Sequence, residues 1–427
     1  MTGFFITKAG GCTKRGLDSE RIRNYLLANG LEQARSLEEA DCVIVTTCGL
    51  SEFHENDSVD RIQRAQGHQA RTIVYGCLPS MNAERLSGVF DGAIVHTQDI
   101  EEFDRLFPDF AVAFADVPDA NYLIEEMGVR FREWFKRQLN RLDLYYPLQL
   151  YNACLVSAEQ LRERMEGVWP RVAPRPFITR IPVFTITTRT GGFGLRISDG
   201  CLGNCSYCNI RTAIGRLRSK PIPALLEELG RGLADGKSNI SVLSSDTGSY
   251  GLDIGCTLPE LLGAILDYDE AIVMDFVEDL HPVWVCRYQS ELIELVATKR
   301  IKSMLIPVQS GSARVLRLMR RSTNIEAPVS VIREMKRVNP RLRLRGQVIL
   351  GFPTETEEDF QATVDLVKRC QFDEIDIFQY FETDKMDSTK IEPKIAQDIV
   401  LDRIRRMQTA LPRQTITHPL YQGLRKK

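Results

Sequence analysis

Three of the eleven cysteines lie close together in a segment whose spacing is typical of a redox metal centre. These loop cysteines, Cys201, Cys205 and Cys208, follow an expected strand in a loop that contains glycine. Because iron–sulfur clusters ordinarily take four thiolates, three suit a cubane cluster with one iron left open. An open iron can bind a substrate and pass it an electron. A structural zinc site is the alternative, but zinc usually takes four ligands, and His96 and His281 are far away in the sequence.

A second set of three cysteines is spread along the N-terminal part of the chain. Cys12 follows the first expected strand, and Cys48 and Cys77 follow the second and third. We name these the sheet-edge cysteines, because the carboxyl ends of parallel strands meet at the edge where α/β sheets bind ligands. Gly11 and Gly76 would let the backbone approach a bulky cluster closely. The alternative is that the three are small buried side chains, as we expect for the other five. Those five are Cys42, Cys154, Cys256, Cys286 and Cys370.

The elements expected to position the sheet-edge cysteines lie in residues 1–110. Apolar and β-branched runs predict strands, and helical patterns lie between them. The strands are expected at 4–7, 42–46, 72–75 and 93–96, and the helices at 17–29 and 52–66. This alternation predicts an α/β domain with a doubly wound parallel sheet.

The loop cysteines belong to a second α/β region, at residues 190–390. Six strands are expected at 194–198, 240–243, 272–276, 303–307, 343–350 and 375–378, with helices that include 222–233 and 355–370. Six units are too few for a closed eight-stranded barrel and predict a partial (β/α)6 barrel, open along one side. Residues 111–189 are expected to form a largely helical insert or linker, and residues 391–427 a C-terminal helix and tail.

Composition excludes several classes of protein. The formal net charge of -2 excludes a strongly basic nucleic-acid-binding coat, and 43% hydrophobic with 26% charged residues is typical of a soluble globular protein. We find no apolar run long enough for a membrane helix and no signal peptide, so we expect a cytoplasmic protein without a membrane partner. In that reducing compartment, cysteines favour metal binding or catalysis over disulfides.

The loop motif resembles that of the radical S-adenosylmethionine (SAM) superfamily, in which an aromatic residue precedes the last cysteine, here Tyr207. With the sheet-edge cysteines, it is similar to the methylthiotransferase family of radical SAM enzymes, over most of residues 1–107 and 190–390. Four further segments resemble family motifs in the same order, namely 44–48, 215–221, 307–312 and 351–357. Thr46 and Thr354 depart from the family's asparagine and glycine.

The resemblance implies two [4Fe-4S] clusters and SAM as cofactors. The loop cysteines would be the catalytic set that holds the SAM-cleaving cluster, and the sheet-edge cysteines would hold an auxiliary cluster. In the family, sulfur on the auxiliary cluster is methylated by one SAM. A second SAM yields a 5'-deoxyadenosyl radical that activates the substrate carbon, and a C–S bond forms.

Contacts with SAM are expected from several strand ends of the barrel. The expected SAM-contacting residues are Tyr207, Ser244, Ser245, Asp246, Gln309, Ser310, Val348 and Leu350, the last two against adenine. For the loop at 244–247, a simple turn and helix cap is the alternative.

Two features bear on the substrate. The family usually has a C-terminal RNA-binding β-barrel module, but the stretch after residue 411 is short and lacks alternating strands. Residues 130–146 interleave basic and aromatic side chains, which can bind nucleic acid, although an amphipathic helix or a substrate lid explains the pattern as well.

The sequence therefore predicts a two-cluster radical SAM enzyme that forms a C–S bond. Methylthiolation of an unactivated carbon on a small molecule or peptide is the leading hypothesis, and tRNA is disfavoured. Sulfur insertion without methyl transfer, an auxiliary cluster used only for electron transfer, and a non-catalytic iron–sulfur sensor or scaffold are the alternatives. A reducing partner such as flavodoxin or ferredoxin is implied by the family.

Overall fold

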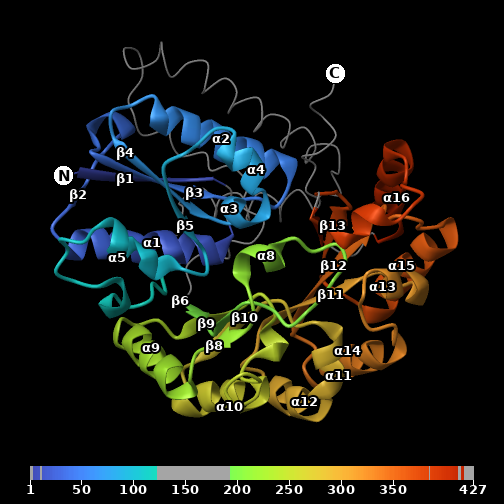
Figure 1. The fold of residues 1–427 in the computed structure, drawn as a ribbon. Coiled ribbons are helices and arrows are strands. Elements are labelled where there is room, and N and C mark those ends of the chain that lie inside the picture. Colours follow the sequence, from blue (N-terminus) through green and yellow to red (C-terminus); the bar gives the residue numbers. More distant parts are fainter. Residues whose placement is uncertain (1–2, 10–11, 123–192, 384, 412–414, 418–427) are drawn as a thin grey trace, which may run out of the picture.

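The computed structural model describes residues 3–9, 12–122, 193–383, 385–411 and 415–417. Two α/β units pack against each other, an N-terminal unit drawn in blue and cyan and a larger unit drawn from green to red (Figure 1). The helices and the basic, aromatic stretch expected between residues 123 and 192 lie outside the described residues. No helix in the described ranges combines the length and apolar character needed to cross a membrane.

The N-terminal unit is a five-stranded parallel sheet in the order β2-β1-β3-β4-β5. Its strands are β1 (Gly3–Lys8), β2 (Glu32–Gln33), β3 (Cys42–Thr47), β4 (Arg71–Gly76) and β5 (Ala93–His96). Its helices are α1 (Thr13–Ala28), α2 (Glu52–Gln66), α3 (Leu78–Met81), α4 (Ala83–Ser87) and α5 (Phe103–Leu106). The four expected strands and the doubly wound parallel sheet are confirmed, and β2 is an addition.

Both faces of this sheet are buried. All six residues of β3 are buried, and successive side chains of a strand point to opposite faces. Ile44 belongs to the cluster on the α1 side, with Tyr25, whereas Val45 belongs to the cluster on the α2 side, with Ile62. Phe114, beyond the expected boundary at residue 110, is also fully buried in the α1-side cluster. The segment that follows α5 therefore packs onto the N-terminal core.

The second unit is an open parallel sheet of seven strands in the order β14-β13-β12-β11-β10-β9-β6. The strands are β6 (Phe193–Arg196), β9 (Asn239–Leu243), β10 (Val273–Val277), β11 (Ser303–Gln309), β12 (Arg343–Leu350), β13 (Glu374–Gln379) and β14 (Thr415–Thr417). All six expected strands are present, which confirms the partial barrel. The region 391–427, expected as a helix and tail, also supplies β14, which pairs in parallel with β13.

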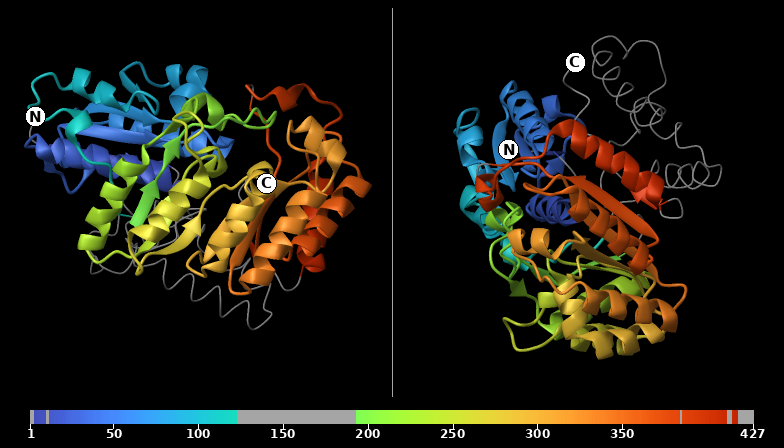
Figure 2. Two further views of the ribbon diagram at one scale, coloured as in Figure 1. Left: turned by 90° about the horizontal axis from the view of Figure 1, so that it is seen from below. Right: turned by 90° about the vertical axis from the view of Figure 1, so that its right-hand side faces the viewer.

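Helices cover the outer face of the curved sheet (Figure 2). The longer ones are α9 (Ile222–Ala234), α10 (Leu258–Tyr268), α12 (Gln289–Ala297), α14 (Glu326–Val338), α15 (Glu357–Cys370) and α16 (Gln397–Ala410). Their apolar side chains and the outward side chains of the strands form one continuous core. The opposite face of the sheet and the carboxyl ends of its strands are left to form a site.

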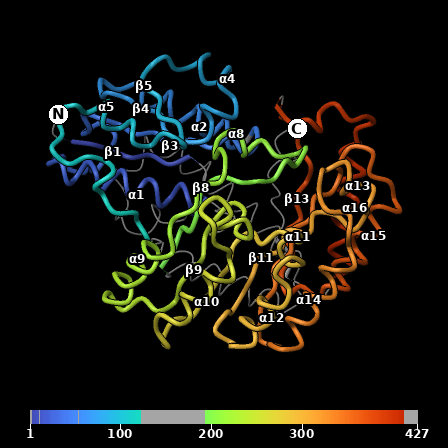
Figure 3. The backbone as a smooth tube through the Cα atoms, turned by 60° about the horizontal axis from the view of Figure 1, so that its bottom comes forward, coloured from blue at the N-terminus to red at the C-terminus, as the bar shows by residue number. Residues whose placement is uncertain are grey.

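The two units meet where the N-terminal sheet ends and the loop cysteines begin. Helix α8 (Ile210–Ile214) follows Cys208 and lies between the units, against α3 (Figure 3). Asn209 Nδ2 donates to Met81 O at 3.3 Å, and Ala213 packs with Cys77 and Met81 in a small buried cluster. This packing turns the sheet edge that carries the sheet-edge cysteines towards the loop.

Candidate functional site

The sheet-edge cysteines lie at the carboxyl ends of three adjacent strands. Cys12 precedes α1 after β1, Cys48 follows β3, and Cys77 follows β4. In the order β2-β1-β3-β4-β5, the connections from β1 and β3 leave in opposite directions, and the crevice between these two strands is where doubly wound sheets bind ligands. The topology therefore brings together three thiols that are far apart in sequence.

The three thiols lie close enough to influence one another's ionisation. Burial, and then the neighbouring Cys77 and Cys12, raise the pKa of Cys48 well above its usual range. Burial raises the pKa of Cys77 to about 11, while the Arg15 guanidinium opposes that shift. No disulfide joins any of the described cysteines. Cys77 is buried, Cys48 is half-buried and Cys12 is exposed. Clustered and unbridged thiols of this kind fit a cationic metal centre, which would stabilise their thiolate forms.

Gly76 is needed for the close approach of two strands. It has φ +126°, and a Cβ there would lie 2.4 Å from Thr47 O and 2.8 Å from Thr47 N. Glycine is therefore required for β4 to approach β3 beside Cys48 and Cys77, and its expected approach to a cluster stays a prediction. Gly11 lies outside the described residues.

The loop cysteines lie in an excursion held at its base by two short antiparallel strands, β7 (Ser198–Asp199) and β8 (Arg218–Ser219). Gly200, with φ +82°, permits the chain to cross there, because a Cβ would meet Arg216 O at 1.9 Å. Ser206 anchors the far side, donating from N to Met319 O at 3.1 Å and from Oγ to Leu318 O at 2.7 Å.

Charges around the loop cysteines are unevenly distributed. Burial, and then the Asp246 carboxylate, raise the pKa of Cys201 to about 12, and burial also raises the pKa of Cys208. Cys205 instead faces a cation, with Arg321 Nη1 3.8 Å from its Sγ. All three thiols are unbridged, as at the sheet edge.

Across the described ranges, no three His, Cys, Asp or Glu side chains converge tightly enough to hold one metal ion. A zinc ion about 2.3 Å from each sulfur would require such convergence. A cluster takes one thiolate on each of several irons, so its cysteines lie further apart. Three unbridged thiols in each set are the donors that a [4Fe-4S] cluster with one open iron takes.

Asp246 links the loop cysteines to the barrel. It is 1% exposed and accepts a hydrogen bond from Trp284 Nε1 at 2.8 Å, with His281 Nδ1 at 3.5 Å and Cys201 Sγ at 3.7 Å. Its side chain caps no helix, although it precedes the short 3-10 turn Thr247–Ser249. The contacts therefore point to the cysteine loop and argue against a simple cap.

Ser244, at the carboxyl end of β9, is fully buried and lies 2.8 Å from Ser198 through the two hydroxyl oxygens. Its Oγ also accepts the Asp246 N–H at 3.2 Å, and Ser245 between them is half-buried. Ser244 therefore braces the strand end beside the cysteine loop.

Gln309 and Ser310 stand at the end of β11. Gln309 adopts φ +65° and is 7% exposed, and its Oε1 has no hydrogen-bond partner among the described residues. Ser310 is fully buried, 3.3 Å from Thr363 Oγ1, and accepts the Ser312 N–H at 3.1 Å. Since buried polar atoms are usually paired, the Gln309 oxygen is the one here with capacity to bind a ligand.

Val348 and Leu350 differ from the expectation that they pack against adenine. Both are fully buried in the core that the strands form with α14 and α15 on the outside of the sheet. Ile349 points to the other face and packs in a cluster against which Tyr207 also lies. Side chains alternate along a strand, so the residue facing the site is the one between the two that we expected.

Two functional cations have no counterpart in the sequence motifs. Arg321 donates to Tyr207 Oη at 3.2 Å and to Pro307 O at 2.8 Å, besides its contact with the loop cysteines. Lys14 crosses from α1 to the barrel, donating to Glu278 Oε2 at 2.8 Å and to Ser244 O at 3.0 Å. Only weak signals for these two residues are present in the sequence. Arg321 lies shortly after the 307–312 motif, and Lys14 lies two residues after Cys12.

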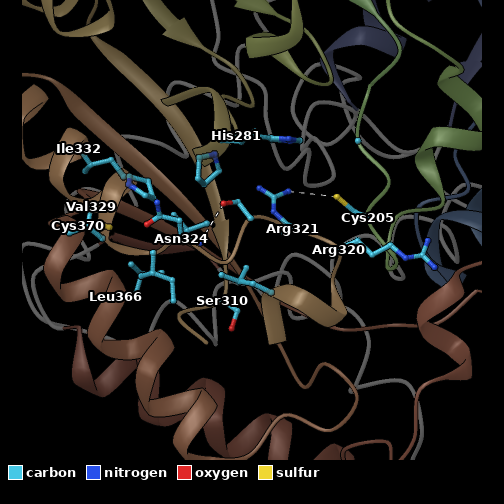
Figure 4. Close-up of a pocket in the computed structure, with 18 of the residues that line it drawn as sticks. Cys205, His281, Ser310, Arg320, Arg321, Asn324, Val329, Ile332, Leu366 and Cys370 are labelled. Carbon is cyan, nitrogen blue, oxygen red and sulfur yellow. Dashed lines mark hydrogen bonds between the residues drawn. The ribbon is translucent and has the colours of Figure 1, made fainter. Parts of the chain in front are cut away.

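A cavity of about 250 Å³ opens beside Cys205. Figure 4 shows His281 and Arg321 on the side of Cys205, and Val329, Ile332 and Cys370 at the opposite, apolar end. The pocket is therefore polar where it borders the cysteine loop and apolar where it is lined by side chains of α14.

Comparison with known proteins identifies the two units. Residues 195–367 match the radical SAM superfamily, and residues 4–95 match the uncharacterized protein family UPF0004. The chain is 27% identical over 404 residues to the ribosomal protein uS12 methylthiotransferase RimO of Vibrio cholerae, covering 93% of this chain and 74% of that protein. It is 28% identical over 374 residues to a probable threonylcarbamoyladenosine tRNA methylthiotransferase of Pyrococcus horikoshii, covering 87% and 75%.

Among solved structures, the fold resembles that of the radical SAM methyltransferase TsrM from Kitasatospora setae, with a TM-score of 0.56 and 13% identity over 89% of this chain and 75% of that one. The fold and the cysteine loop thus define a radical SAM enzyme. More specifically, the chain belongs to the radical SAM methylthiotransferase family, whose members transfer sulfur, carry two [4Fe-4S] clusters and use SAM.

Proposed function

We propose that this protein methylthiolates an unactivated carbon of a peptide or small molecule. In this proposal, the loop cysteines hold the SAM-cleaving cluster and the sheet-edge cysteines hold the auxiliary cluster. When bound, the two groups supply electron transfer to SAM and the sulfur to be transferred. The chain's own contribution is to hold both close to one buried interface.

The observation that carries this proposal is the short path between the two cysteine sets. Lys14, two residues after Cys12, donates to Ser244 O at 3.0 Å. Asp246, two residues after Ser244, lies 3.7 Å from Cys201 Sγ. Reaction with sulfur at one centre and a radical from the other requires this proximity.

Four residues are proposed to bind and orient SAM at the barrel. Arg321 would pair with the SAM carboxylate, and Gln309 Oε1 would accept a hydrogen bond from a donor group of SAM, because that oxygen is buried and has no partner among the described residues. Asp246 and Tyr207 would form the walls, held in place by Trp284 Nε1 and by Arg321 respectively. Asp246 and Gln309 are buried, and Tyr207 and Arg321 are half-buried, so together they would limit the access of water to the radical.

The charges at the interface are the observation that bears on the substrate class. Three carboxyl groups, on Asp246, Glu278 and Asp279, lie close together there with two cations, Lys14 and Arg321. The interface therefore offers no excess of positive charge to a phosphate backbone, which favours a peptide or small molecule over RNA. One relative is named for a ribosomal protein and another for tRNA, so the product assay must include both classes.

We further propose that a flavodoxin or ferredoxin supplies the electron and that the protein is cytoplasmic. The described cysteines are all unbridged, which supports a reducing compartment.

The test compares anaerobically reconstituted wild type with the triple variant Cys12→Ala, Cys48→Ala, Cys77→Ala. We expect about eight irons in the wild type and about four in the variant, with SAM cleavage retained and methylthiolated product lost. Cys42→Ala, a buried cysteine of the same sheet, is the matched control and should keep all the iron. Four irons in both proteins would reduce the proposal to a single-cluster radical SAM enzyme. Sulfur product without a methyl group would indicate plain sulfur insertion.

A further inference from the structure

A buried carboxylate joins the two units at a point that neither cysteine set occupies. Asp18 of α1 has a side chain 2% exposed, and its Oδ1 accepts Arg196 Nη1 of β6 at 2.6 Å. Its Oδ2 accepts Arg15 Nη1 at 2.6 Å and the Tyr75 hydroxyl at 2.7 Å. One carboxylate therefore holds two guanidinium groups and a phenol, from three separate elements.

Each partner of Asp18 either contacts a cysteine of one of the two sets or lies a few residues before one in the chain. Arg15 donates its backbone N–H to Cys12 Sγ at 3.4 Å, and Tyr75 lies two residues before Cys77 in β4. Arg196 ends β6, and the chain continues from there through β7 to Cys201. The carboxylate thus ties the segment before the loop cysteines to two segments of the sheet edge.

We propose that Asp18 is a positioning residue that sets the separation between the two cysteine sets, and so couples SAM cleavage to sulfur transfer. This inference rests on the proposed function. The rate of transfer between two separately held centres falls steeply when one is displaced relative to the other. About 1 Å of misplacement can lower the rate by about 100-fold.

The negative charge of Asp18 explains why a neutral side chain at this position would not hold Arg15 and Arg196 together equally well. Arg15 and Arg196 face one carboxylate, and each guanidinium disfavours the other's charge. Two further carboxylates lie near the Arg196 fork: Asp119, at 3.5 Å from Nη2, is shared with Arg21 and Lys220. Asp199, at 3.8 Å from Nη1, has a side chain that is 34% exposed and so compensates less than the buried Asp18. An asparagine at position 18 would keep the shape but leave the two guanidinium groups to repel across the interface.

The test compares Asp18→Asn with Asp376→Asn, which is matched in substitution, burial and partner. Asp376 has a side chain 2% exposed and pairs with Arg345 at 2.7 Å, but both lie within the barrel. We expect both variants to bind iron as the wild type does and to lose thermal stability. Only Asp18→Asn should lower the methylthiolated product formed per 5'-deoxyadenosine, by about 10- to 100-fold.

Amide hydrogen exchange gives a readout that does not depend on turnover. Asp18→Asn should speed exchange on both sides of the bridge, in residues 12–19 and 197–205, whereas Asp376→Asn should leave both segments unchanged. Equal product ratios and equal exchange in the two variants would show that Asp18 is merely structural and overturn the inference.

Two further outcomes are separable. If wild type cleaves SAM but makes no methylthiolated product, the proposed function fails, and exchange at the two segments still decides the role of Asp18. If Asp18→Asn does not fold, Arg196→Lys carries the test, because it keeps the charge and loses the forked geometry. Arg196→Lys should also lower the methylthiolated product formed per 5'-deoxyadenosine, to a smaller extent than Asp18→Asn. A wild-type ratio in Arg196→Lys would contradict the inference.

Discussion

Arg321 is the side chain that most directly connects the parts of the barrel site. It contacts Cys205 Sγ at 3.8 Å, Tyr207 Oη at 3.2 Å and Pro307 O at 2.8 Å, which belong to the cysteine loop and to β11. Because the guanidinium remains charged at any pH that the protein meets, it offers a permanent cation beside the Cys205 sulfur and for the SAM carboxylate that we propose it binds.

Arg321→Met should therefore slow reductive SAM cleavage while leaving the iron content unchanged. Loss of a hydrogen bond to a charged group is worth about 1.5–3 kcal/mol, or roughly 10- to 100-fold in rate. The measurement is 5'-deoxyadenosine formed with a chemical reductant. Arg320→Met is the control, because Arg320 lines the same pocket (Figure 4) but pairs with Asp387 at 2.6 Å, with both side chains exposed, where little loss is expected. Equal rates in the two variants would remove Arg321 from the site.

Sequence reasoning found the cysteines and Asp246 but missed the neighbouring cations, Lys14 and Arg321, for a physical reason. The spacing of Cys201, Cys205 and Cys208 is local and is visible in one segment. Lys14 contacts Ser244 across a separation of 230 residues, which only the packing of the units determines. Val348 was assigned to the wrong face because β12 is apolar at consecutive positions, and such a run does not reveal which side faces the helices.

At the scale of elements, α16 is attached to the sheet by its apolar face, with Val400, Ile404 and Met407 in the core, and by a buried ion pair. Arg403 Nη1 of α16 lies 2.8 Å from Glu355 Oε2, with side chains 6% and 0% exposed. Burial raises the pKa of Glu355 to about 7, although the Gly351 N–H and Arg403 oppose the shift. The carboxyl group therefore keeps its proton to a higher pH in the native protein than in the unfolded chain.

This shift predicts that stability falls as pH rises. The unfolded chain releases the Glu355 proton near pH 4.5, and the native protein near pH 7, so the native state binds more protons between these values. The unfolding free energy should fall by up to about 3 kcal/mol across this window and level off above it. Urea unfolding at several pH values should show a flatter profile for Glu355→Gln. Glu357→Gln, whose carboxylate is 52% exposed, should retain the wild-type slope. A wild-type profile without this fall would contradict the assignment.

Long elements were predictable and short ones were not. Helix α2 and strand β12 have the expected bounds, because a periodic helix and a long buried strand carry enough side chains to specify themselves. Strands β2 and β14 have two and three residues and lie at sheet edges. Their strand conformation comes from the free edge of the neighbouring strand and not from their own residues.

For the whole molecule, the interface between the units is charged as well as close-packed. Lys14 is 13% exposed and Glu278 7% exposed in their side chains. Burial and then Glu278 raise the pKa of Asp279 to about 7, although Lys14 opposes both effects. The Lys14 ammonium group thus pairs with Glu278 of the other unit and also acts on the neighbouring Asp279.

Lys14→Met should weaken the interface and make the two units unfold separately. Removing one partner of a buried ion pair costs about 3–5 kcal/mol, and here the loss falls between units with separate cores. Anaerobic urea unfolding followed by circular dichroism should change from one transition to two. Lys336→Met is the matched control, since Lys336 is 16% exposed, pairs with Asp373 at 2.6 Å and donates to Leu342 O, all within the barrel. It should lower the midpoint and keep one transition. A single transition in Lys14→Met, or two in both variants, would show that the interface does not depend on this lysine.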